Sequence, residues 1–82
     1  DIRTPSFLNV KLEINKKNNL VELNKRIQNI DLIENIYVQD FNKNFMNLRI
    51  KYLGKLDNII LQLKKENINL QLSKDQWIIR TL

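Results

Sequence analysis

The residue types present in this sequence limit the chemistry that it could perform. Its 82 residues include no cysteine and no histidine, which excludes thiolate nucleophiles, imidazole bases, disulfides and the common zinc ligand sets. The carboxylates are scattered over caps, turns and exposed positions, without the paired spacing of an acid/base couple or of an oxygen cage for a metal. We therefore predict a domain that is not an enzyme and that needs no cofactor and no metal.

A second set of residues has types that bind rather than react. Aromatic and cationic side chains alternate with apolar ones in three segments, so that strands there would bring rings and cations to one face of a sheet. The candidate binding residues are Phe7, Lys11, Tyr37, Phe41, Phe45, Arg49 and Lys51. Such rings anchor protein interfaces, and rings with cations also bind single-stranded nucleic acid. Both classes of partner stay open on this pattern.

Periodicity predicts the elements that must position these residues. Apolar residues alternate with polar ones over 8–14, 36–41, 45–52 and 68–72, which is typical of strands with one buried face. Apolar residues spaced three and four apart predict helices over 20–30 and from 56 to about 65. Asn19 followed by Glu22 predicts a capped start for the first helix, and Glu22 with Arg26 adds an i,i+4 ion pair.

The order strand, helix, strand, strand, helix, strand predicts an α+β fold of the ferredoxin-like βαββαβ kind. One mostly antiparallel sheet would carry both helices on one face, with the first and third strands in its centre. Residues 77–80 are expected to return as an extra C-terminal hairpin strand. Residues 1–6, with Pro5, are expected to be a linker or strand lead-in, and residues 7–82 a single domain.

Two functions known for folds of this topology do not match the sequence. Soft-metal carriers need a Cys-x-x-Cys motif in the loop after the first strand, where this chain has Asn15-Lys16-Lys17-Asn18-Asn19. RNA-recognition domains carry K/R-G-F/Y-G/A-F-V-x-F/Y on the third strand. Residues 43–50 match its basic residue and its first aromatic, but Asn47 stands where a stacking ring is needed.

The net charge of +5 favours an anionic partner less than it first suggests. Asn, Ile and Lys are abundant and alanine is absent, so that A/T-rich codons explain part of the lysine content.

No apolar run approaches the length of a membrane span, and we expect a soluble chain. The start at Asp1 rather than at Met leads us to expect a piece of a larger protein.

Residues 30–38, residues 48–56, Leu70-Gln71-Leu72 and Trp77 together resemble the C-terminal domain of an uncharacterised proteobacterial envelope family. In that family a Val/Ile-x-x-Val strand entry, a Tyr-x-Gly-x-Leu helix start and a late tryptophan recur. The resemblance covers roughly residues 6–80, and it departs from the pattern at Asp31-Leu32, where Pro-Gly is frequent. It implies a location in the bacterial cell envelope or periplasm and carries no catalytic residue over to this chain.

The resulting prediction is a non-catalytic protein-interaction or assembly domain of a larger bacterial envelope protein. Its partner would be the upstream domain of the same protein or another subunit, bound by the exposed sheet face or by an edge strand. The alternative is a nucleic-acid-binding domain that uses the same open face. Trp77 is expected to close the end of the core, with an anchoring role in an interface as its alternative.

Overall fold

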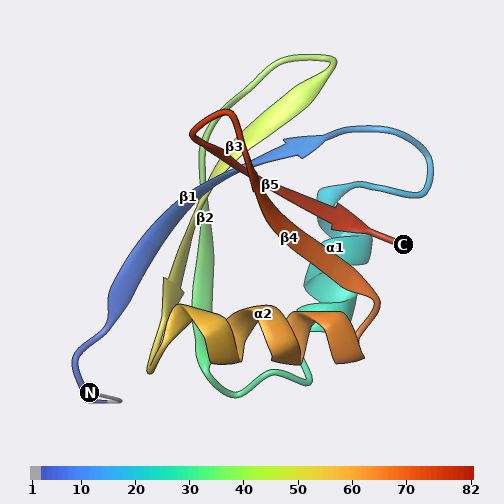
Figure 1. The fold of residues 1–82 in the computed structure, drawn as a ribbon. Helices are drawn as coiled ribbons and strands as arrows, with labels where there is room; N and C mark the ends of the chain where they lie inside the picture. The colour runs from blue at the N-terminus through green and yellow to red at the C-terminus, as the bar shows by residue number, and fades with distance from the viewer. Residues whose placement is uncertain (1–2) are drawn as a thin grey trace.

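The computed structural model describes residues 3–82 as a small α+β fold with a five-stranded mixed sheet and two helices (Figure 1). In chain order the elements are β1 (Ser6–Glu13), α1 (Leu20–Ile27), β2 (Ile33–Phe41), β3 (Phe45–Tyr52), α2 (Leu56–Lys65), β4 (Ile68–Ser73) and β5 (Gln76–Thr81). The expected lead-in over residues 1–6 lies partly outside the described residues, and its last residue, Ser6, already belongs to β1.

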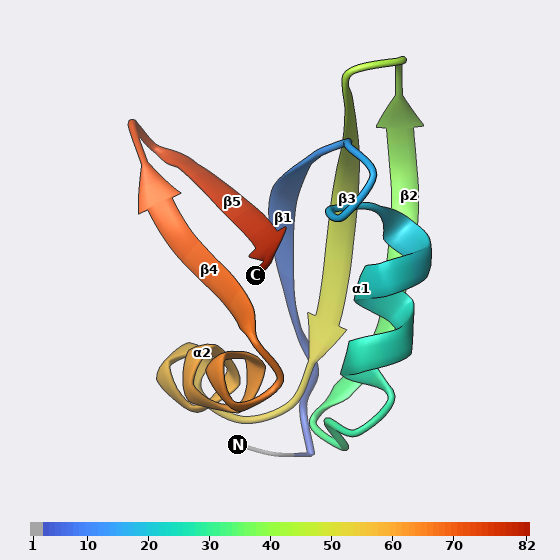
Figure 2. The ribbon, with the colours of Figure 1, turned by 90° about the vertical axis from the view of Figure 1, so that its right-hand side faces the viewer.

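The ferredoxin-like arrangement is not confirmed, because the strand order is β2-β3-β1-β5-β4. In that arrangement the fourth strand would pair with β1 in antiparallel fashion. Here β5 occupies the position beside β1 and runs parallel to it, with Lys11 opposite Ile78, while β4 is displaced to the edge. The extra C-terminal strand is therefore present, but it lies inside the sheet. The β4–β5 hairpin leans away from the other three strands (Figure 2).

The alternating pattern predicts the buried face of β1 and β3 correctly. Val10 and Leu12 on β1, with Leu48 and Ile50 on β3, are almost completely buried. They form one core with Leu23 of α1, with Ile59 and Leu63 of α2, and with Ile68, Leu70 and Ile79 of the C-terminal hairpin. Both helices thus contribute to one hydrophobic core, to which Trp77 adds a partly buried ring at the margin.

The start of α1 follows the predicted capping pattern, whereas its end comes earlier than expected. The Asn19 side chain accepts a hydrogen bond from the Glu22 amide at 2.9 Å, and Glu22 pairs with Arg26 at 3.0 Å, so both predictions are confirmed. The helix ends at Ile27, and Ile30 is buried from the turn that follows. In α2 the N-cap is Lys55, which has no side-chain cap, just after Gly54 at φ 82°.

The asparagines of the β1–α1 loop are structural. The Asn15 side chain accepts hydrogen bonds from the amides of Lys17 and Asn18. The Asn18 side chain is buried, donates to the Glu13 carbonyl at 2.6 Å, accepts from the amide of Thr81 and contacts the Thr81 hydroxyl. Residues 63 positions apart are therefore joined inside the fold.

Arg26 makes a second long-range connection. Besides Glu22, its guanidinium donates hydrogen bonds to the carbonyl oxygen of Asn67 at 2.8 Å and to an oxygen of Leu82 at 3.0 Å. The Leu82 amide in turn donates to the Asn67 carbonyl. The helix α1, the start of β4 and the end of β5 are thus held by one side chain.

The β4–β5 turn is expected to be a site of stored strain. Lys74 and Asp75, the two central residues, have φ values of 49° and 65°, a left-handed geometry that Asn-Gly adopts at lower cost. Replacing them with Asn and Gly should raise the free energy of unfolding by about 1 to 2 kcal/mol. Urea denaturation would show this as a higher midpoint with an unchanged slope. Lys43→Asn in the β2–β3 turn is the control and should change stability by less than about 0.5 kcal/mol. A lower midpoint for the Asn-Gly variant would contradict the argument.

No helix in the part of the chain that the structure describes is long and apolar enough to cross a membrane.

Candidate functional site

The candidate site is the sheet face that points away from the core, which we call the open face. Its centre is built by β1 and β3, where Phe7 lies opposite Lys51, Asn9 opposite Arg49, Lys11 opposite Asn47 and Glu13 opposite Phe45. On the neighbouring strand, Tyr37 lies opposite Arg49. Directly paired residues of antiparallel strands project to the same face. Six of the seven predicted binding residues, all except Phe41, are thereby brought together.

Phe41 does not join the open face, contrary to the prediction. The pairing of β2 with β3 shifts by one residue between Val38 and Asp40, and Phe41 then lies opposite Met46, which is on the core-facing side of β3. A β-bulge reverses the alternation for every residue beyond it. Phe41 projects beyond the core and is 71% exposed.

Two of the rings on the open face are covered by cations of the same chain. The Lys11 ammonium lies 4.3 Å from the centre of the Phe45 ring, and the Arg49 guanidinium carbon lies 5.4 Å from the centre of the Phe7 ring. Both pairs are diagonal neighbours on β1 and β3, a spacing that long side chains can bridge. The attraction between cation and ring holds each side chain against the sheet.

Polar or charged side chains contact Arg49, Lys51 and Asp40 on this face. Arg49 donates from Nε to the Asn9 side chain at 3.2 Å, and Lys51 lies 3.8 Å from the Glu34 carboxylate. A further bond joins the Asn47 amide to the Asp40 carboxylate at 2.7 Å. The strand register places Glu13 and Arg80 on this face as well. Cations and carboxylates therefore nearly balance, although the whole chain carries +5.

A shallow hollow lies at the β2 side of the open face. Phe7, Tyr37, Val38, Gln39 and Arg49 line it. Phe7 is 51% exposed and Tyr37 is 43% exposed, and Arg49 lies between their strands. Two half-exposed rings beside a guanidinium supply apolar area together with directed hydrogen-bond donors, the combination enriched at binding surfaces.

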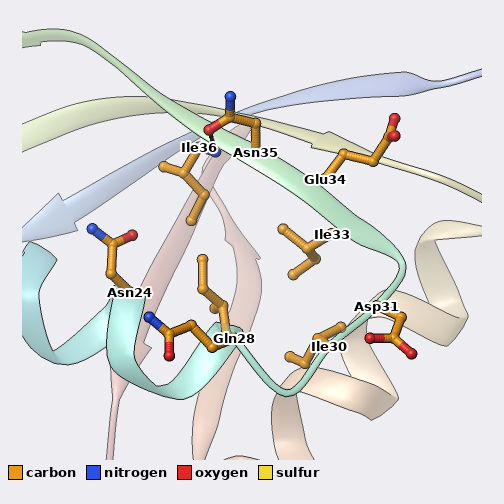
Figure 3. A pocket seen from close by; sticks show the side chains of 9 residues that line it. Asn24, Gln28, Ile30, Asp31, Ile33, Glu34, Asn35 and Ile36 are labelled. Carbon is orange, nitrogen blue, oxygen red and sulfur yellow. Dashed lines mark hydrogen bonds between the residues drawn. The ribbon is translucent and has the colours of Figure 1, made fainter.

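A second depression lies between α1 and β2 on the core side (Figure 3). Ile33 and Ile36 point toward α1, and polar side chains of Asn24, Gln28 and Asp31 surround the space (Figure 3). Its ionisable lining groups are Asp31 and Glu34, whose carboxylates point away from each other (Figure 3). This arrangement brings together no acid/base couple. Among residues 3–82, no group of three metal-ligating side chains could hold a metal ion.

Sequence reasoning missed the polar contacts of the open face. Asn9, Glu34 and Asp40 each hold or balance a residue of the open face, and Ile78 and Arg80 extend that face across β5. The apolar run from Trp77 to Ile79 departs from the alternation of β1 and β3, because Ile78 places an apolar side chain on the open face opposite Lys11. The bulges of β2 have no comparable signal in the sequence.

Comparison with protein-family models, with curated proteins and with solved structures finds no match to this chain.

Proposed function

We propose that this chain is a non-catalytic protein-interaction domain that binds its partner through the open face. The observation that carries the proposal is the hollow in which Phe7, Tyr37 and Arg49 meet. Its rings are half-exposed, and Arg49 is held in place by the Asn9 side chain and by the Phe7 ring. A pre-positioned guanidinium between two rings loses little side-chain entropy on binding, which favours a specific contact.

The groups that line the hollow support a proposal for the chemistry of the partner. An aliphatic or aromatic side chain would cover Phe7 and Tyr37, and a carboxylate beside it would accept hydrogen bonds from the Nη groups of Arg49, since the Nε is already bonded to Asn9. The partner is thus a protein surface that carries an apolar residue next to an acidic one. In keeping with the resemblance to an envelope family, we propose that this surface belongs to another domain or subunit of a bacterial envelope protein.

The charge arrangement favours a protein partner over nucleic acid. Lys11 already covers the Phe45 ring, so stacking of a base on that ring would first have to displace the lysine. Asn47, bonded to Asp40, occupies the central position where a further stacking ring would be required. Carboxylates on the same face would also repel phosphate.

Selection from a random peptide library tests this function and requires no candidate partner. Selection on the immobilised domain should yield ligands that carry a carboxylate beside an apolar residue. Tyr37→Ala and Arg49→Gln should each weaken their binding about tenfold, as expected for a residue at the centre of an interface. Val21→Ala, at an exposed position on α1, is the matched control and should leave binding unchanged.

Two results would contradict the proposal. One is the selection of ligands whose affinity does not depend on Tyr37 or Arg49. The other is binding of mixed-sequence single-stranded RNA or DNA with a Kd below about 1 μM at roughly 150 mM salt, abolished by Tyr37→Ala, which would favour the nucleic-acid function instead.

A further inference from the structure

The two edges of the sheet differ in a way that points to a second interaction surface. Edge strand β2 is nine residues long and has register shifts on both sides of its centre, between Ile33 and Asn35 and between Val38 and Asp40. It also carries the carboxylates of Glu34 and Asp40. Bulges and charges are the devices by which proteins keep an edge strand from pairing with another chain.

Edge strand β4 has none of these devices. Its six residues pair with β5 in continuous register, from Ile68 opposite Thr81 to Ser73 opposite Gln76, without a bulge. The strand contains no charged residue and no proline, and its charged neighbours, Glu66 and Lys74, stand outside it. In Figure 2, β4 forms the outer margin of the sheet, with α2 below its first residues. Within the described sheet β4 pairs only with β5, so its outer edge has no strand partner there.

The sequence of β4 is complementary to itself. In antiparallel pairing about a twofold axis through Leu70, Ile68 would lie opposite Leu72 of the second copy, and Asn69 opposite Gln71 of the second copy. Directly opposite residues share a face, so apolar side chains would meet apolar ones on the core side and amides would meet amides on the open side. Leu72, which is 55% exposed in the single chain, would gain an apolar neighbour.

We propose that β4 pairs in antiparallel fashion with β4 of a second copy of this chain, which joins the two sheets into one. Such an interface is isologous, since one strand supplies both halves, and it closes at two copies. It uses the β4 edge of the sheet, whereas the hollow at Phe7, Tyr37 and Arg49 lies toward the β2 edge. The proposed dimer is therefore independent of the function proposed above.

The charge of the chain gives this dimer a characteristic salt dependence. Each copy carries +5, and Lys64, Lys65 and Lys74 flank β4 in the sequence, so that two approaching copies repel each other. Added salt screens that repulsion and should strengthen the dimer. Binding to nucleic acid has the opposite dependence and weakens as salt rises.

Sedimentation equilibrium on the purified chain tests the proposal, at roughly 50 and 500 mM salt and protein concentrations up to about 1 mM. We expect a monomer–dimer equilibrium that strengthens with salt. Gln71→Lys places like charges close together across the twofold axis and should weaken dimerisation about tenfold or more. Leu72→Lys is a second variant at an exposed position of the same strand and should act in the same direction.

Gln39→Lys is the matched control, because it makes the same substitution at an exposed position of the other edge strand. It should leave the dimer unchanged, and thermal unfolding should confirm that all variants fold. A chain that stays monomeric at every concentration and salt would overturn the proposal. So would a dimer that Gln39→Lys disrupts and Gln71→Lys does not. Neither result affects the peptide-binding test, which depends on Tyr37 and Arg49.

Discussion

Leu48→Ala should lower the free energy of unfolding by about 2 to 5 kcal/mol, because it leaves a cavity in a fully buried site. Leu48 is 0% exposed and lies between Val10 of β1 and Val38 of β2 in the cross-strand register. A chain of 82 residues has a free energy of unfolding of about 4 to 12 kcal/mol, so the variant should lose a large fraction of its stability. Urea denaturation followed by circular dichroism measures the loss.

Leu61→Ala is the matched control for this substitution. Leu61 lies on α2 with 57% of its surface exposed, and the same truncation there should change stability by less than about 0.5 kcal/mol. If Leu48→Ala and Leu61→Ala lower the free energy of unfolding by the same amount, the assignment of a buried and an open face to the sheet is wrong.

Asn18→Ala should cost about 1 to 3 kcal/mol, a large effect for a polar residue in a loop. It removes the acceptor for the buried Thr81 amide, and a buried group left without a partner costs about that much; it also removes the donor to the part-buried Glu13 carbonyl. Asn58→Ala, at an exposed position of α2, is the control and should change stability by less than about 0.5 kcal/mol.

A double-mutant cycle with Thr81→Val separates the hydrogen bonds from a general disturbance of the loop. The Thr81 hydroxyl contacts the Asn18 side chain at 3.2 Å and donates to the Lys17 carbonyl at 2.7 Å. Thr81→Val should therefore cost less in the Asn18→Ala background than in the original chain, as residues of one network do not act additively. Additive costs would show that the two side chains stabilise the fold independently.

The features that depend on neighbouring residues could be predicted from the sequence. The cap at Asn19, the Glu22–Arg26 pair and the two faces of β1 and β3 follow from spacings of two to four residues, and the structure confirms them. The position of β5 could not be predicted in this way, because its parallel pairing with β1 joins residues more than sixty positions apart. Local patterns predict that a strand exists, but they do not determine which strands pair with it in the sheet.

The candidate site shows the same division. Alternation predicts Phe7, Lys11, Tyr37, Phe45, Arg49 and Lys51 on one face, and the structure brings them together there. The prediction for Phe41 is wrong because the bulge before Asp40 changes the alternation. The ring–cation pairs of Lys11 with Phe45 and of Arg49 with Phe7 depend on the register between strands, which the alternation does not supply. The partner of the open face and the envelope location stay predictions.

The interior position of β5 has a consequence for the synthesis of the chain. Of the strands in this sheet β1 is made first, yet one of its two neighbours, β5, is made last, and β4 joins the sheet only through β5. While residues 76–81 are still inside the ribosome, β1 exposes an unpaired edge and Asn18 lacks Thr81. Until then the nascent chain can form only a three-stranded sheet of β1, β2 and β3. We therefore expect it to be most prone to aggregation in the interval before β5 emerges.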